Sequence, residues 1–150
     1  MKYRIATVSD CEALTDIRMR MRKELDPDFT PELIYAETLD FFRRNMKGGT
    51  HIAFVCEHDR QMIATVGITL FEMMPTTKYP NGKAARLMNM YVEPCYRNRG
   101  IAKELLNRVI AYAEEHQIGK IMLNPSWMGK TLHENYGFQR LSDEYVFYLC

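Results

Sequence analysis

The sequence predicts an α/β protein of the α+β type, built on a mixed, mostly antiparallel sheet of six or seven strands with about four helices. Three observations predict this class. Apolar residues recur at helical spacing in the first third of the chain, alternate as in strands through the middle third, and return to helical spacing after residue 100. A chain of 150 residues is long enough for one hydrophobic core, so we expect a single domain over residues 1–150.

The first third is expected to contribute two helices. Ser9 and Glu12 have the spacing of a capping box and predict a first helix over residues 10–25. Its apolar stripe consists of Leu14, Ile17, Met21 and Leu25. A second helix is expected to begin at Pro31, where proline lacks only an N–H that a helix start leaves unpaired, and to end at Gly48.

Four segments before residue 93 are typical of β-strands. A short strand is expected over residues 3–6, and three longer ones over 51–57, 62–71 and 84–92. In the third of these segments Ala64, Val66, Ile68 and Leu70 alternate with the residues between them. The three longer strands follow one another without an intervening helix, which predicts an antiparallel meander.

The segment after Gly100 is expected to form a βαβ unit. An apolar stripe predicts a helix that ends near Gly119 and is followed by a short buried strand over 120–124. Because a helix connects that strand to the strand over 84–92, the two should be parallel, with a right-handed crossover. The remaining predicted elements are a short helix over 127–135 and a closing strand over 144–149.

Composition excludes several classes of protein. Hydrophobic residues make up 47% of the chain and charged residues 26%, which is typical of a globular protein. The 20 basic and 19 acidic residues give a net charge of +1, so we expect no nucleic-acid partner. No apolar run is long enough to span a bilayer and the first residues do not form a secretory signal, so we expect a soluble cytoplasmic protein without a membrane partner.

The four cysteines and four histidines predict neither a disulfide framework nor a metal site. The cysteines lie far apart in the sequence, with no Cys-x-x-Cys pair. The histidines fall at no ligand spacing relative to them. We therefore expect free thiols and no metal.

The loop between the strand over 84–92 and the next helix carries the strongest chemical signal. After Pro94 come Arg97, Arg99, Gly100 and Ala102, at the start of the helix. The first turn of a helix has N–H groups without partners and a partial positive charge, to which two arginines add full charges. This combination predicts a binding site for a phosphate or diphosphate. The alternative is a turn glycine between solvated arginines.

Two common phosphate-binding patterns are excluded for this loop. No Gly-Lys-Ser/Thr follows the glycine, which excludes a nucleotide P-loop. The glycine triplet of a dinucleotide-binding fingerprint is incomplete, and the preceding strand belongs to a meander.

The same residues resemble the acetyl-CoA signature of the GNAT superfamily of N-acetyltransferases, Arg/Gln-x-x-Gly-x-Gly/Ala, with Arg97, Gly100 and Ala102 on its defined positions. Residues 132–138 are similar to the Leu-Tyr-Glu-x-x-Gly-Phe ending of the family's last helix. The order of predicted elements resembles that of the family over nearly the whole chain. The resemblance implies a GNAT-like sheet with a splayed parallel strand pair, acetyl-CoA as co-substrate, and transfer of its acetyl group to an amine.

The resemblance also implies which residues bind acetyl-CoA. The pantetheine arm would lie between the splayed strands and pair with the strand backbone at Met90, Tyr91 and Val92, and an N–H near Val92 would donate to the oxyanion. The diphosphate would lie beside Arg97 on the N–H groups of the helix start, namely those of Asn98, Arg99, Gly100, Ile101 and Ala102. Asn124 either reaches the pantetheine or the acceptor, or only begins a turn before Pro125.

The catalytic residues depart from the family pattern. At the position of the family's usual acid, a tyrosine, this chain has His133. His133 is a candidate proton source for the CoA thiol because imidazole titrates near neutral pH, and the alternative is a structural or solvent-facing histidine. In that case the acid would be Tyr136 or water. Glu72 and Glu93 are candidates for the base, with solvated strand-end carboxylates as the alternative.

These observations predict an acetyl-CoA-dependent N-acetyltransferase that acts on the amine of a small molecule. Two alternatives stay open, namely acetylation of a protein N-terminus or lysine, and a non-catalytic acyl-CoA-binding module. Acceptor specificity is expected in the first two helices and the loop over 71–83. Glu24, Asp26 and Asp28 either attract a cationic acceptor or form a solvated acidic turn. The oligomeric state is open, with a homodimer among the possibilities.

Overall fold

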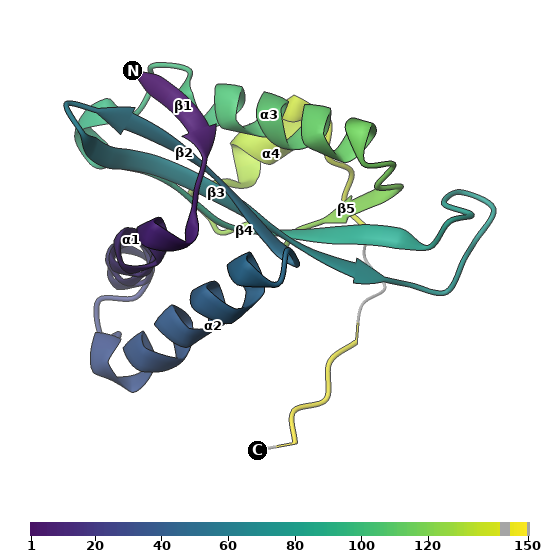
Figure 1. Ribbon diagram of the computed structural model, residues 1–150, viewed down its shortest axis with the longest axis horizontal. Helices are drawn as coiled ribbons and strands as arrows, with labels where there is room; N and C mark the ends of the chain where they lie inside the picture. The colour runs from purple at the N-terminus through teal and green to yellow at the C-terminus, as the bar shows by residue number, and fades with distance from the viewer. Residues whose placement is uncertain (142–144, 150) are drawn as a thin grey trace.

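The computed structural model describes residues 1–141 and 145–149, which contain a five-stranded sheet in the order β1-β2-β3-β4-β5 (Figure 1). The strands are β1 (Lys2–Ile5), β2 (His51–His58), β3 (Gln61–Glu72), β4 (Lys83–Val92) and β5 (Lys120–Met122). Neighbouring strands from β1 to β4 are antiparallel, whereas β5 is parallel to β4. The predicted meander and the predicted parallel pair are both confirmed.

Two helices cover each face of the sheet (Figure 1). The helices are α1 (Cys11–Leu25), α2 (Tyr35–Lys47), α3 (Ile101–Glu115) and α4 (Lys130–Tyr136), and 3₁₀ turns are present at Val8–Asp10, Pro31–Leu33 and Pro94–Tyr96. Helices α1 and α2 pack on one face, and α3 and α4 on the other. Among the described residues, no helix combines the length and the apolar composition that a membrane crossing requires.

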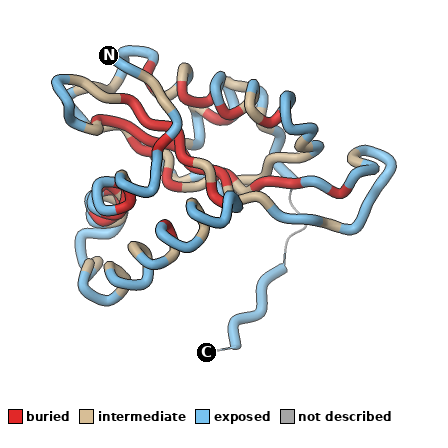
Figure 2. Tube along the Cα trace, viewed as in Figure 1, coloured by how far each residue is buried: buried red, intermediate tan, exposed pale blue. Residues whose placement is uncertain are grey.

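The central strands are buried on both faces because their apolar residues are nearly continuous. In β2, Phe54 and Cys56 belong to the core cluster beneath α3, while Ala53 and Val55 pack with α1 and α2. The α3 stripe that the sequence predicted supplies Ile101, Leu105, Leu106 and Val109 to the first cluster. Figure 2 shows the buried positions gathered along the sheet and on the inner sides of α1 and α3.

The start of α1 differs from the prediction of a Ser9–Glu12 capping box. The carboxylate of Asp10 accepts a hydrogen bond from the backbone N–H of Thr7 at 2.7 Å, and the helix begins one residue later, at Cys11. Asp10 is held in place by Arg4, whose guanidinium donates to it from β1 at 2.8 Å. The carboxylate bond of Asp10 thus serves the 3₁₀ turn over Val8–Asp10, and no described side chain caps α1 itself.

The start of α2 also differs from the prediction. Pro31 opens a 3₁₀ turn, as expected of a proline at a helix start, but Ile34 has φ −133° and ψ 3° and interrupts the helical backbone. The α-helix therefore begins at Tyr35, and it ends before Gly48 as predicted.

The prediction of a closing strand over 144–149 is wrong where the structure describes it. Residues 145–149 form no strand, and their side chains are 67–96% exposed; Glu144 lies outside the described residues. The described sheet therefore has five strands, and the predicted number of six or seven is wrong. Alternating apolar residues make a strand only where a sheet edge pairs with them, and this segment runs away from the sheet (Figure 1).

A buried histidine connects α2 to the sheet. His51 is 3% exposed, and the centroid of its ring lies 5.4 Å and 5.3 Å from those of Phe41 and Phe42. Its Nδ1 atom shares a hydrogen bond of 2.9 Å with the hydroxyl of Thr69, and its Nε2 atom has no partner. Burial, assisted by the positive charge of Arg18, lowers the pKa of His51 to about 4.

We expect His51 to make the protein less stable as the pH falls from 6.5 toward 4. In this range the unfolded state holds a proton on the histidine and the folded state does not, so the free energy of unfolding increases with pH. Urea unfolding between pH 4.5 and 7 measures this slope, which should be shallower for His51→Gln and unchanged for His116→Gln, an exposed histidine. Equal slopes for the wild type and His51→Gln would contradict the assignment.

Candidate active site

The loop before α3 presents a row of backbone N–H groups without partners. Asn98 and Gly100 have positive φ angles of 61° and 77°, which turn the chain sharply into the helix. No side chain caps α3, and its first hydrogen bond runs from the N–H of Glu104 to the carbonyl of Gly100. The N–H groups of residues 98–103 are thus left unpaired within the described chain. Unpaired amides at the positive end of a helix dipole favour an anion at such a place.

Beside this loop, strands β4 and β5 diverge. They pair only over Ala84–Arg86 and Lys120–Met122, and the rest of β4 has no partner on that side. The register between β3 and β4 places two residues, Asn89 and Met90, opposite Val66 alone, which is a β-bulge. A bulge bends the strand that carries it, and here the bend separates β4 from the chain that follows β5.

A pocket of about 840 Å³ fills the gap between the diverging strands. It is lined by residues 86–92 of β4 on one side and residues 123–129 on the other. Residues of α3 and α4 contribute from one face of the sheet, and residues 18–25 of α1 contribute from the other. The pocket therefore passes through the sheet, so that two molecules can meet in it from opposite faces.

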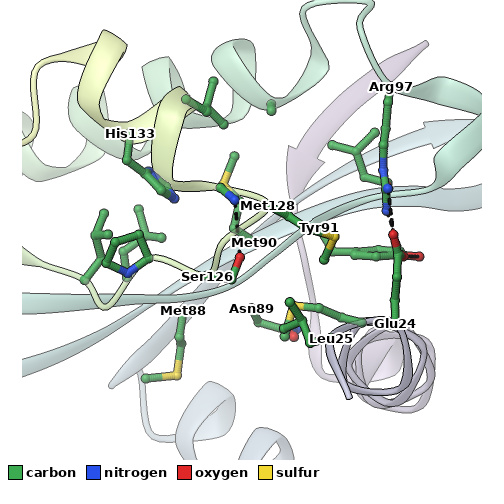
Figure 3. A pocket seen from close by; sticks show the side chains of 18 of the residues that line it. Glu24, Leu25, Met88, Asn89, Met90, Tyr91, Arg97, Ser126, Met128 and His133 are labelled. Carbon is green, nitrogen blue, oxygen red and sulfur yellow. Dashed lines mark hydrogen bonds and ion pairs between the residues drawn. The ribbon is translucent and has the colours of Figure 1, made fainter. Parts of the chain in front are cut away.

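An ion pair crosses from α1 to the loop before α3. Both oxygens of the Glu24 carboxylate accept hydrogen bonds from the Arg97 guanidinium, at 2.7 Å and 2.8 Å (Figure 3). Arg97 also donates to the carbonyl of Val92 at 2.9 Å, and its guanidinium lies 5.3 Å from the centre of the Tyr91 ring. The hydroxyl of Tyr91 completes the group by donating to Glu24 at 2.9 Å. The side chain of Arg97 therefore holds the loop against α1.

The charges in this group stabilise one another. Hydrogen bonding to Arg97 lowers the pKa of Glu24, and the same bond raises the pKa of Arg97. Burial and the hydrogen bond to Glu24 raise the pKa of Tyr91 to about 12. All three residues thus keep a single protonation state near pH 7, with the carboxylate charge neutralised.

His133 lies on the opposite side of the pocket from the Glu24–Arg97 pair (Figure 3). It is 5% exposed, and its ring packs edge-on against Phe138 at 5.5 Å between centroids. Its Nδ1 atom is buried without a hydrogen-bond partner, and burial lowers its pKa. Gly129 leaves room for the ring, since a Cβ there would lie 3.3 Å from Nε2. His133 is therefore a neutral imidazole near pH 7, without a structural hydrogen bond among the described residues.

The structure gathers most of the predicted site residues around this pocket. Those that line it are Met90, Tyr91, Val92, Arg97, Asn98, Gly100, Ile101, Ala102, Asn124 and His133. Arg99 is not among them, because its guanidinium donates to the carbonyl of Cys95 at 3.0 Å and lies over the ring of Tyr96. The acceptor region is only partly as expected: α1 lines the pocket, whereas α2 and the loop over 71–83 do not.

Three predicted acid–base candidates lie outside the pocket lining. The hydroxyl of Tyr136 donates to the Oδ1 atom of Asn107 on α3 at 2.8 Å, and Tyr136 does not line the pocket. Glu72 pairs with Lys83 at the far end of the β3–β4 hairpin, eight residues or about 26 Å of strand from the end that carries the site. The carboxylate of Glu93 pairs with Arg20 at 2.7 Å.

Two residues with a place in the site were missed by the sequence analysis. Glu24 was considered as an attractor of cations or as part of a solvated turn, whereas it binds Arg97 across 73 positions of sequence. Asn89 was given no role, although it lines the pocket at the bulge with φ 56°, 5% exposed and with an unpartnered Oδ1 atom. An asparagine within an apolar strand was a usable signal, because asparagine tolerates positive φ.

The cysteine and histidine side chains play no visible part in a metal site. Among the described residues, no group of three or more His, Cys, Asp or Glu side chains is placed to hold a metal ion. Cys11 and Cys56 are buried free thiols, and Cys95 is an exposed one.

Comparisons with known proteins agree with this geometry. The sequence model of the acetyltransferase (GNAT) family matches residues 12–138. No curated protein sequence matches the chain. A predicted acetyltransferase from Clostridium acetobutylicum, crystallised with acetyl-CoA, is 30% identical and superposes with a TM-score of 0.91 over 99% of this chain and 96% of its own.

Two further solved structures are similar. A GCN5-related N-acetyltransferase from Ralstonia eutropha JMP134 is 25% identical, with a TM-score of 0.90 over 98% of this chain and 97% of its own. An aminoglycoside N-acetyltransferase in complex with CoA is 17% identical, with a TM-score of 0.73 over 98% of this chain and 92% of its own, and shares the fold.

We expect Glu24→Gln to lower the free energy of unfolding by about 1–2 kcal/mol at pH 7, because hydrogen bonds to a charged partner are lost in a half-buried place. The deficit should shrink as the pH falls through the lowered pKa of Glu24, since protonation removes the same charge in the wild type. Urea unfolding of the wild type and the variant at several pH values measures this difference in the free energy of unfolding. Asp40→Asn, which removes the partner of Arg44 in an exposed pair, is the control and should cost about 0.5 kcal/mol or less. Equal losses in both variants would contradict a special role for the Glu24–Arg97 pair.

Proposed function

The chain belongs to the acetyltransferase (GNAT) family, whose members are acyltransferases that use acetyl-CoA, and on this premise we propose that it acetylates the amine nitrogen of a small molecule. The observation that carries the proposal is the row of unpaired N–H groups at residues 98–103 beside the gap between β4 and β5. A diphosphate fits the row of N–H groups, and a thin pantetheine arm fits the gap between the strands.

The residues present fit acetyl-CoA in detail. The diphosphate accepts hydrogen bonds from the amides of residues 98–103, which no described side chain caps. The small side chain of Ala102 leaves the anion site open, and Lys103 adds a positive charge on the pocket wall. The pantetheine arm lies along Met90, Tyr91 and Val92, on the edge of β4 that faces β5 and that no described strand pairs there. Asn124 lines the opposite wall.

The reaction joins the acceptor nitrogen to the acetyl carbon and breaks the carbon–sulfur bond. The sulfur keeps the electron pair of that bond, the nitrogen loses a proton, and the sulfur must gain one. We assign this proton to His133, and the assignment is supported by its position in the pocket lining as a buried neutral imidazole with no hydrogen bond to a described residue. His133 accepts the proton from the nitrogen and passes it to the sulfur. We assign no step to Tyr136 or Glu72.

Two alternatives predict different behaviour. Acetylation of a protein N-terminus or lysine requires an acceptor groove that a polypeptide can enter, whereas here residues 18–25 of α1 cover one face of the pocket, which supports a small acceptor. A non-catalytic acyl-CoA-binding module would bind the cofactor and release no thiol with any amine. The buried ring of His133 in the pocket supports an enzyme. The cytoplasmic location and the homodimer stay predictions.

Ala102→Glu tests the diphosphate site. A carboxylate there should weaken CoA binding by about tenfold or more, since it repels the diphosphate at short range, while an acidic residue in the first turn leaves the helix stable. Calorimetric titration with CoA measures the affinity, and thermal unfolding monitors the fold. Ala111→Glu introduces the same charge at an exposed position of the same helix, outside the pocket lining, and should bind CoA as the wild type does. Wild-type affinity in Ala102→Glu would refute the site.

His133→Gln tests the proton carrier. We expect kcat/KM to fall by about 10²- to 10⁴-fold with CoA affinity retained. Because burial lowers the pKa of His133, the wild-type rate should rise with pH through a value below 6.5 as the ring becomes neutral, and this rise should be absent in the variant. Thiol release over pH 5–9 measures both effects, with His116→Gln as the control. An unchanged rate and pH profile in His133→Gln would remove the histidine from the mechanism.

A further inference from the structure

Positive charge is concentrated in the pocket although the whole chain is nearly neutral. The chain has a net charge of +1, whereas the described residues of the pocket lining include one acid, Glu24, and five bases: Arg18, Arg22, Arg86, Arg97 and Lys103. Glu24 is neutralised by Arg97. Of the other four, Arg18, Arg22 and Lys103 form no ion pair with a described carboxylate.

These cations lie at two ends of the pocket. Lys103 belongs to the first turn of α3, at the proposed diphosphate site. Arg18 lies on α1 six residues before Glu24, or about 9 Å farther along the helix from the contact with the α3 loop. Arg86 lies six residues before Val92, about 20 Å back along β4. Arg18, Arg22 and Arg86 thus surround the part of the pocket that the diphosphate does not reach.

Arg18 is the least compensated of these side chains. It is half-buried, and no hydrogen bond or ion pair joins it to another described residue. Its neighbour one turn later is Arg22, a like charge, and burial together with that charge lowers the pKa of Arg18. Arg22 stacks on the ring of Phe29 at 5.5 Å, and the buried ring of His51 near Arg18 is neutral. A half-buried guanidinium among such neighbours destabilises the fold unless an anion binds it.

Asn89 supplies an uncharged hydrogen-bond acceptor in the same pocket. Its Oδ1 atom is buried and accepts no hydrogen bond among the described residues, and its backbone at φ 56° forms part of the bulge. A buried amide oxygen without a partner costs free energy, and it is a suitable acceptor for an ammonium or amine N–H. The pocket therefore offers one cationic group, Arg18, and one hydrogen-bond acceptor, the Oδ1 atom of Asn89, that no described residue pairs.

We propose that the acceptor is an amine that also carries an anionic group, a carboxylate or a phosphate, with Arg18 binding the anion and Asn89 accepting a hydrogen bond from the amine. This inference rests on the proposed acetyl transfer and specifies its acceptor. A purely cationic acceptor is disfavoured, because the oxygens of Glu24 already accept hydrogen bonds from Arg97 and Tyr91. A guanidinium binds both carboxylate and phosphate through paired N–H groups, so either anion satisfies the geometry.

Binding of acetylated products to the CoA complex tests the inference without turnover. The probes are N-acetylglycine and its uncharged counterpart N-acetylglycinamide, and N-acetyl-O-phosphoethanolamine with its counterpart N-acetylethanolamine. We expect at least one anionic probe to bind about 10- to 100-fold more tightly than its neutral partner, and the pair that shows the difference identifies the anion. Equal affinities, tighter binding of the neutral probes, or no binding of any probe would overturn the inference.

Variants assign the effect to Arg18. Arg18→Gln should abolish the preference for the anionic probe, whereas Arg44→Gln, which removes an exposed arginine on α2, should keep it. Because Arg18 has no hydrogen-bond or ion-pair partner among the described residues, Arg18→Gln should unfold at the same or a higher urea concentration than the wild type. A clear loss of stability would show a structural role instead and refute the assignment. Failure of CoA itself to bind would refute the proposed function, and it is measured separately in the titration of the wild type.

Discussion

The site depends on one local constraint, the bulge at Asn89 and Met90. With two residues opposite Val66, β4 bends and its pairing with β5 stops after three residue pairs. The pocket lies in the gap that opens where this pairing stops, along the β5-facing edge of residues 90–92; on the other edge Tyr91 and Val92 pair with β3, and the carbonyl of Val92 accepts from Arg97. Because this gap opens directly beside the unpaired amides at the start of α3, one ligand could contact both the amides and the pocket.

The group of Glu24, Arg97 and Tyr91 connects the two halves of the site. Arg97 occupies a signature position of the family, and in this chain its guanidinium is engaged by Glu24 and by the carbonyl of Val92. In the proposed complex the diphosphate would therefore be bound by the main chain and the helix dipole, while the arginine holds the loop against α1. The same helix presents Arg18 and Arg22 to the acceptor end of the pocket, so that movement of α1 would change both ends together.

The departure of the last helix from the family pattern has a structural counterpart. The position of the usual tyrosine points into the pocket, and the imidazole that stands there is buried, neutral and without a hydrogen bond among the described residues. Tyr136 is three residues later but hydrogen-bonds Asn107 on α3, outside the pocket. Three residues along a helix return to within about 60° of the same direction, so the helical period does not separate the two side chains, and it is the hydrogen bond to Asn107 that directs the Tyr136 hydroxyl toward α3.

The sequence by itself determined the order of the elements, the meander, the parallel βαβ unit and the anion site before α3. These features follow from the periodic spacing of apolar residues, from turn residues and from helix-end residues, which are local properties of the chain. Only the tertiary structure decided that the Asp10 carboxylate bonds Thr7 and Arg4 where a Ser9–Glu12 capping box was expected, that residues 145–149 add no strand, that Glu24 pairs with Arg97, and that Glu72 and Tyr136 lie outside the pocket that His133 lines. Each of these outcomes depends on a partner distant in the sequence or on which neighbour a side chain meets, and local spacing carries no information about either.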